Sequence, residues 1–320
     1  MILRGHEAAW AEWRAALGSG RMHHAWILAG PRGLGKGLFA SAAAAALVAE
    51  PGVPQPDPDK HPDILIPEHP PENKDEEKKR ADGDMDIRRK RSIPIDEIRA
   101  VQHRLITRPT LGSRRAVIID PADDLEKGAV NALLKSLEEP PAGTYFLLVA
   151  HRPGRLLPTI RSRCRVLRFS PLADADVHAI LADLAPDSPL ETREAAVAAA
   201  LGAPGVALEF LKQDLGPLHQ IMRAIMTRGD DDFALRGALA EAIGARPDRE
   251  RMQAAVELAR AIVAAELAQA SRERQQRIVA AYGALVRLAA QFPTHNFDAG
   301  LAAMEIGGLL ASAAMPREAA

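Results

Sequence analysis

A glycine-rich run at residues 30–37 contains the first residues whose types and spacing suggest chemistry. Gly30, Gly35 and Lys36 stand at the spacing of a P-loop, in which backbone N–H groups and a helix N-terminus surround phosphate oxygens. Gly33 lies within the same turn, and Lys36 would reach the β- and γ-phosphates of a nucleotide. These four residues are therefore the predicted nucleotide-binding positions.

The residue after the lysine departs from this pattern. A working P-loop has Ser or Thr there, whose hydroxyl binds Mg²⁺, whereas this chain has Gly37. Because glycine has no side-chain oxygen, the metal loses a protein ligand. The sequence predicts the P-loop fold with damaged catalysis. It indicates no required cofactor and no metal site, and it leaves weak ATP binding open.

An apolar strand ending in an acid, at residues 116–120, has the form of a Walker B segment. In such a segment Asp120 would help to hold Mg²⁺. In ATPases with this kind of segment, the residue after the aspartate is a glutamate that activates the attacking water. In this chain the residue after Asp120 is Pro121. Two interpretations of Asp120 stay open: a surviving metal contact in a degenerate Walker B segment, or the plain end of a buried strand.

Two further runs follow in order. Residues 131–141 read Asn-Ala-Leu-Leu-Lys-Ser-Leu-Glu-Glu-Pro-Pro, and residues 157–164 read Leu-Pro-Thr-Ile-Arg-Ser-Arg-Cys. Within the second run, Arg163 could be an ordinary surface arginine that pairs with a nearby acid. Cys164 is interpreted as a small packed residue, because no base that would activate a nucleophile is identifiable near it.

The elements that must position these motifs alternate between strand and helix. The expected strands are 25–29, 64–66, 116–120, 145–150 and 166–169. This alternation predicts a parallel sheet with helices on both faces. Beyond Pro171 only helical periodicity remains, beginning with helices at 174–184 and 191–201.

Composition sets outer limits on the function. A chain of 320 residues suits two or three domains, and its net charge of −1 argues against nucleic-acid binding by bulk electrostatics. A single cysteine excludes an internal disulfide framework and a cysteine-cluster zinc site. No signal core or membrane-length run is evident, so we expect a cytoplasmic protein.

The segment at residues 68–91 is dense in balanced charge and nearly devoid of apolar residues. Such a segment buries too little surface to offset the entropy of ordering, which predicts a solvated, disordered loop. Its basic end, residues 88–91, also leaves open a patch that faces DNA or a partner protein.

Together the P-loop, the damaged Walker B segment and the two later runs resemble the AAA+ clamp-loader family of bacterial DNA polymerase III. The resemblance is good over about residues 5–215. It implies an α/β fold: an AAA+ P-loop domain at 1–170 with a charged insertion near 68–91, a small helical lid domain at 171–215, and an all-α collar domain for oligomerisation at 216–320.

The resemblance also implies a function. The chain would be an ATPase-deficient subunit within the polymerase III holoenzyme, a nucleotidyltransferase complex. Arg163, in its motif with Ser162 and Cys164, would serve as an arginine finger in the ATP site of a neighbour. The implied partners are gamma/tau-type ATPase and delta subunits, with the sliding clamp and primed DNA met through the complex, and no membrane. Zinc is not expected, because residues 51–63 lack the four-cysteine module of many relatives.

Two other functions stay open at this point. An active AAA+ ATPase, such as the loader's motor subunit or a helicase motor, would hydrolyse ATP by itself. A small-molecule P-loop kinase would need an acceptor site and a lid of mobile arginines. The alanine-rich helices at the end of this chain suit oligomerisation better than such a lid.

Overall fold

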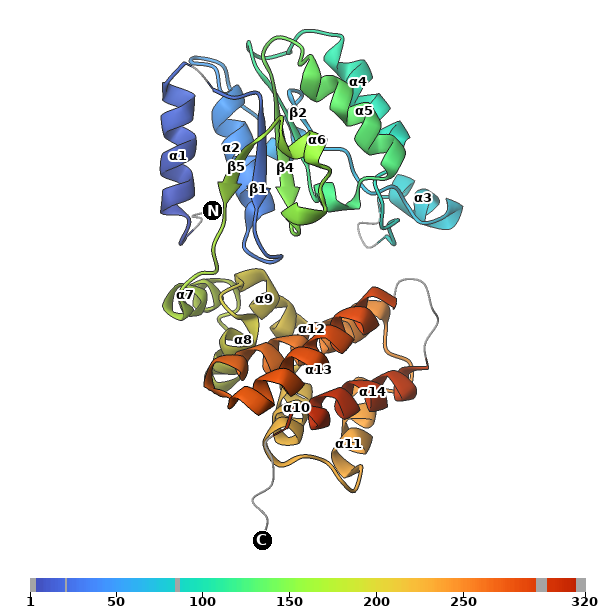
Figure 1. Cartoon of the computed structure of the whole chain (residues 1–320). Coiled ribbons are helices and arrows are strands. Elements are labelled where there is room, and N and C mark those ends of the chain that lie inside the picture. Colours follow the sequence, from blue (N-terminus) through green and yellow to red (C-terminus); the bar gives the residue numbers. More distant parts are fainter. Residues whose placement is uncertain (1–3, 21, 84–86, 292–297, 315–320) are drawn as a thin grey trace. The chain divides into compact units, whose positions relative to one another are not determined.

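The computed structural model describes residues 4–20, 22–83, 87–291 and 298–314, and the chain divides into two compact units, Met1–Ser170 and Pro171–Ala320 (Figure 1). The first unit contains a five-stranded sheet in the order β2-β3-β4-β1-β5, with every neighbouring pair parallel. Its strands are β1 (Ala25–Ala29), β2 (Ile64–Leu65), β3 (Arg115–Ile119), β4 (Thr144–Ala150) and β5 (Arg165–Arg168). The predicted parallel α/β fold is confirmed.

The register of β1 decides where the motifs lie. Ala29, its last residue, pairs with Ala150 in β4 and with Arg168 in β5. Because all strands run in the same direction, their C-terminal ends share one edge of the sheet. The P-loop after β1 and Asp120 after β3 therefore lie at that edge, whereas the residues that precede β5 lie at the opposite edge.

Helices cover both faces of the sheet (Figure 1). On one face α4 and α5 share a core with alternate strand residues such as Ile27, Val117 and Phe146. On the other face Trp13 of α1 packs edge-on against Trp26 of β1, with 5.3 Å between ring centroids. The helical elements of this unit are α1 (Glu7–Gly18), α2 (Lys36–Val48), η1 (Pro58–Lys60), α3 (Lys74–Ala81), α4 (Ile95–Leu105), η2 (Ala122–Asp124), α5 (Lys127–Glu138), η3 (Pro153–Arg155) and α6 (Pro158–Arg161).

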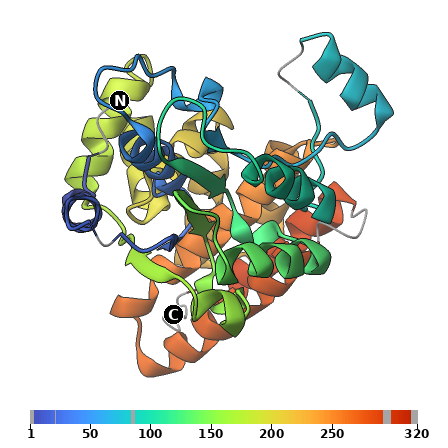
Figure 2. The ribbon, with the colours of Figure 1, turned by 90° about the horizontal axis from the view of Figure 1, so that it is seen from above.

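In its described residues, 68–83 and 87–91, the charged segment is not the disordered loop that its composition predicts, because it contains α3; residues 84–86 lie outside the described ranges. Asn73 caps this helix by accepting hydrogen bonds from the N–H groups of Asp75 and Glu76, both at 3.0 Å. The two ends of the segment are joined by a backbone hydrogen bond, in which the N–H of Lys90 donates to the carbonyl of Pro70 at 2.7 Å. Figure 2 shows α3 standing apart from the sheet.

The order of the charges explains why α3 forms. Acidic residues occupy its first turn and basic residues its last, which complements the helix dipole. Glu76, only 6% exposed, accepts from the N–H of Arg88 and from Nζ of Lys79, both at 2.9 Å. Composition alone hides this signal, because the balance of charge says nothing about its position along a helix.

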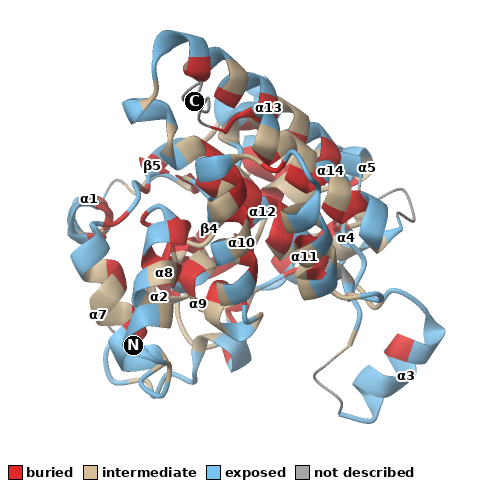
Figure 3. Ribbon diagram, turned by 90° about the horizontal axis from the view of Figure 1, so that it is seen from below, coloured by how far each residue is buried: buried red, intermediate tan, exposed pale blue. Residues whose placement is uncertain are grey.

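The second unit is entirely helical and has a core that extends from Leu172 to Ala313. Buried positions lie along α10, α12 and α14 (Figure 3). The division into a lid at 171–215 and a collar at 216–320 stays a prediction. No helix in the described ranges is long and apolar enough to span a membrane. The elements are α7 (Asp174–Leu184), α8 (Leu190–Ala200), α9 (Pro204–Lys212), α10 (Gly216–Arg228), α11 (Ala234–Ile243), α12 (Arg249–Ala265), η4 (Leu267–Gln269), α13 (Arg272–Gln291) and α14 (Ala299–Ser312).

Replacing residues 72–88 by a short Gly-Ser linker should leave the free energy of unfolding within about 1 kcal/mol of the parent chain. The reason is that no described apolar core residue of the first unit comes from this stretch. Urea denaturation measures the effect, and a loss above about 2 kcal/mol would show that α3 supports the sheet. Asp63→Ala is the positive control, because it strands the buried partner Arg115 and should cost about 3–5 kcal/mol.

Candidate functional site

The P-loop forms a tight turn between β1 and α2. Gly33 and Gly35 have φ of 83° and 77°, a left-handed conformation that glycine adopts without a steric penalty. Gly30 packs so closely on the carbonyl of Phe169 that a side chain there would overlap it. No side chain caps the start of α2 at Gly35, so its first N–H groups suit an anion. The structure thus brings the predicted glycines together.

Lys36 lies inside this turn and is only 2% exposed. Its Nζ donates to the carbonyl of Pro31 at 2.5 Å. Burial lowers the pKa of Lys36 to about 8, while the charges of Asp120 and Asp123 act in the opposite direction. The side chain therefore holds a partly desolvated amino group within the P-loop turn, bonded to the backbone of the loop.

Asp120 lies directly against the first turn of α2. Its Oδ2 is so close to Gly37 that a Cβ on residue 37 would overlap it. Burial raises the pKa of Asp120, and the charges of Lys36, His69 and Arg32 oppose that rise. A Mg²⁺–nucleotide held as in a working P-loop does not fit these residues, because the hydroxyl is missing and the carboxylate fills the place where the side chain of residue 37 would begin.

Two further residues, Asp123 and His151, lie at the same edge and were not predicted as site residues from the sequence. Asp123 accepts from the N–H groups of His151 at 2.6 Å and of Arg152 at 2.9 Å. Burial, followed by the charge of Lys36, lowers the pKa of His151 to about 4, so the ring is neutral at pH 7. Its Nδ1 is buried without a hydrogen-bond partner. A signal existed, since Asp123 follows β3, His151 follows β4, and both strands end at the P-loop edge.

Arg163 lies at the opposite edge of the sheet. It comes shortly before Arg165, which pairs with Trp26 near the start of β1. The side chain of Arg163 is 34% exposed and forms an ion pair with Glu138 at 2.7 Å. It also donates to the carbonyl of Thr159 at 2.9 Å. The structure therefore does not bring Arg163 together with the P-loop of its own chain.

The neighbours of Arg163 in the motif are structural in this geometry. Ser162 donates from Oγ to the carbonyl of Thr159 at 3.1 Å. Burial raises the pKa of the Cys164 thiol to about 12, so the thiol stays protonated at neutral pH and is a poor nucleophile. Within the described ranges no group of three His, Cys, Asp or Glu residues is placed to hold a metal ion. The absence of zinc remains a prediction.

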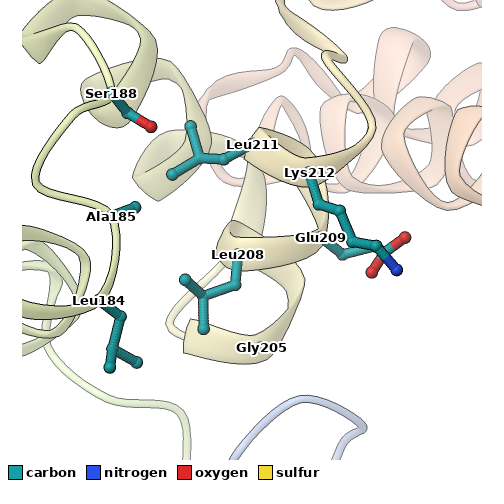
Figure 4. Close-up of a pocket in the computed structure, with 8 residues that line it drawn as sticks. All are labelled: Leu184, Ala185, Ser188, Gly205, Leu208, Glu209, Leu211 and Lys212. Atoms are coloured by element: carbon teal, nitrogen blue, oxygen red, sulfur yellow. The ribbon is translucent and has the colours of Figure 1, made fainter. Parts of the chain in front are cut away.

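A hollow of about 460 Å³ lies in the second unit. Leu208 and Leu211 point across it toward the segment that carries Ser188, whereas Glu209 and Lys212 extend the other way (Figure 4). None of its lining residues belongs to the predicted motifs. Because few polar groups converge on it, the hollow is not the candidate site.

The parallel sheet, the P-loop after its inner strand β1 and the helical unit that follows in the chain define an α/β protein of the AAA+ P-loop class. Residues 5–173 match the sequence model of a family described as DNA polymerase III, delta subunit. The chain belongs to this family, within the delta-prime subunits of the clamp loader. The resemblance predicted from the motifs is confirmed.

The similar proteins include delta-prime and gamma/tau subunits of DNA polymerase III. The delta-prime subunit of Pseudomonas aeruginosa is 34% identical over 211 residues, which cover 62% of this chain and 58% of that protein. That of Escherichia coli K12 is 37% identical over 128 residues, 39% and 37% of the two chains. A gamma/tau subunit of Mycobacterium bovis is 31% identical over 181 residues, 56% of this chain and 30% of that protein. The match thus spans less than two thirds of each relative.

Lys36→Met should stabilise the chain at pH 7 by up to about 3 kcal/mol, because it removes a charge whose burial lowers the pKa from 10.5 to about 8. Between these two pKa values the unfolded wild-type chain binds more protons than the folded one, so wild-type stability rises with pH. The advantage of the methionine variant should therefore shrink from pH 7 to pH 10. Urea denaturation at both pH values measures it, and an unchanged difference would contradict the buried-charge account.

Proposed function

We propose that the chain is an ATPase-deficient subunit of the clamp loader that supplies Arg163 in trans to the ATP site of a neighbouring subunit. The placement of Arg163 and the P-loop at opposite edges of the sheet is the observation that carries the proposal. A phosphate that meets Arg163 must belong to another molecule.

The chain's own site lacks the groups for hydrolysis. Gly37 supplies no hydroxyl for Mg²⁺, and Pro121 stands where a glutamate would activate water. Asp120 remains, but its carboxylate packs against Gly37. The chain thus combines a degenerate Walker A segment with Arg163, which could act in a neighbour's site without the missing hydroxyl and glutamate.

The contacts of Arg163 would allow its guanidinium to exchange the Glu138 carboxylate for a phosphate. Its ion pair with Glu138 involves two side chains that are 34% and 50% exposed, and such surface pairs contribute about 0–1 kcal/mol. A charge-assisted, bidentate bond to a phosphate is stronger. A neighbour's γ-phosphate would therefore displace Glu138 at little cost.

The partners follow from the relatives and the helical unit. We infer gamma/tau-type ATPase and delta subunits as neighbours in a cytoplasmic complex that loads the sliding clamp on primed DNA. On α13, Val279 and Val286 are one heptad apart and 60% and 40% exposed, which suits packing against another subunit. These two exposed valines favour an oligomer over a free-standing kinase.

The purified chain should hydrolyse ATP negligibly, which separates this function from an active AAA+ motor. Losing the metal-binding hydroxyl and the water-activating carboxylate costs on the order of a hundredfold or more each. A coupled-enzyme assay of released ADP measures turnover. Motor-like turnover that Lys36→Ala abolishes would identify an active ATPase instead.

Arg163→Ala should lower DNA- and clamp-stimulated ATP hydrolysis in a reconstituted loader, because one site loses the charge that stabilises the transition state. Such fingers contribute roughly a thousandfold at a single site, and the bulk decrease is smaller where other sites keep theirs. Arg163→Lys should restore little, since lysine lacks the planar fork of donors.

Arg161→Ala is the matched control, because Arg161 is an exposed cation at the end of the same helix, α6. The complexes compared must have equal subunit occupancy. Stimulated hydrolysis and clamp loading that are the same in both alanine variants and in the wild type would refute the role of Arg163 in trans.

A further inference from the structure

The charged segment, described at residues 68–83 and 87–91, forms an arm that contributes nothing to the apolar core. It leaves the sheet after the edge strand β2 and returns before α4, and Figure 2 shows its helix α3 standing apart from the sheet. No buried apolar residue of the described chain comes from the arm. Its polar bonds therefore order a surface and not a core.

Two basic runs of the arm are joined through Glu68. The runs are residues 78–80, in the last turn of α3, and residues 88–91, in the returning segment. Oε2 of Glu68 lies 3.2 Å from a guanidinium nitrogen of Arg80 and 2.5 Å from one of Arg89. Two guanidinium groups thus share one carboxylate, and the junction between the runs retains positive charge.

Glu76 joins the same two runs at a second point. Its carboxylate is buried and accepts from Nζ of Lys79 and from the N–H of Arg88, both at 2.9 Å. Both glutamates are therefore engaged within the arm. The cations that remain are exposed, and among the described residues no carboxylate lies within ion-pair distance of them: Lys78, Arg88, Lys90 and Arg91.

The chemistry of this surface decides which kind of partner it fits. Protein interfaces centre on apolar or aromatic anchors, but none of the exposed large apolar side chains of the described residues lies in the arm. Residues 68–91 contain no Phe, Trp or Tyr on which the bases of a single strand could stack. Arginine and lysine bind phosphate oxygens, which duplex DNA presents in closely spaced rows. The surface therefore fits the backbone of a duplex.

We propose that the basic surface of the arm, residues 78–80 and 88–91, binds the phosphate backbone of duplex DNA without reading its sequence. The inference goes beyond the proposed function, which assigns no DNA contact to any residue of this chain. The net charge of −1 gives no attraction by bulk charge, so the local convergence of the two runs is what matters. The bonds of Glu68 and Glu76 hold the cations in place before binding, which lowers the entropy cost of association.

The test measures the binding of the full chain to a fluorescein-labelled duplex of about 20 base pairs by fluorescence anisotropy at several salt concentrations. The arm variant combines Lys78→Ala, Arg88→Ala, Lys90→Ala and Arg91→Ala, which leaves the bonds of Glu68 and Glu76 in place. It should bind roughly tenfold or more weakly at low salt. The slope of log K against log salt should fall by about 2–3, because each phosphate contact contributes about 0.9.

A matched control removes the same amount of charge from exposed residues of the second unit. It combines Lys212→Ala, Arg228→Ala, Arg272→Ala and Arg287→Ala. Because the net charge falls equally in both variants, the comparison separates the position of the charge from its total. The control should change duplex affinity less than about twofold.

Thermal melting checks that both variants are folded. An equal loss of affinity in the arm variant and the control would overturn the proposal, as would a wild-type chain that does not bind the duplex at low salt or that binds a single strand as tightly. Displacement of the duplex by poly-L-glutamate at an equal concentration of negative charge would assign the surface to an acidic protein instead. These measurements use the isolated chain without ATP, so their failure would leave the role of Arg163 intact, and failure of the Arg163 experiment would leave the arm intact.

Discussion

The common direction of the five strands is the constraint on which the rest of the first unit depends. All five residues of β1 are buried, because helices cover both faces of the sheet and hide the strand completely. Once β1 pairs in parallel with β4 and β5, the loop after Ala29 and the segment before Arg165 must lie at opposite edges. The P-loop and Arg163 thereby lie at different surfaces of the first unit.

Much of this arrangement could be predicted from the sequence. The continuous apolar runs at 25–29 and 145–150 are long enough, and sufficiently β-branched or aromatic, to indicate buried strands, and both are confirmed. The glycines of the P-loop were predictable because only particular backbone angles fit such a turn. The position of the Asp120 carboxylate was not, since it depends on how β3 packs against α2, far away along the chain. From the sequence alone, two interpretations of this residue therefore stayed open.

The helix α3 could not be predicted from composition, for a different reason. Low hydrophobicity with high charge predicts disorder when residues are only counted. The chain instead orders its charges, with Asn73 before α3 (Lys74–Ala81) and bases at its end, and it ties Glu76 to the N–H of Arg88. These contacts are local and polar, so they add a helix without adding to the apolar core. A prediction that weighed capping before composition would have found it.

Retaining a P-loop in which residue 37 has no hydroxyl has a physical cost. An assembled loop leaves N–H groups at the start of α2 uncapped and holds Lys36 in a poorly solvated place. Deleting the loop would remove the connection between β1 and α2, on which the core of the first unit depends. The Asp120 carboxylate lies against Gly37, where burial raises its pKa and the charges of Lys36 and Arg32 oppose that rise.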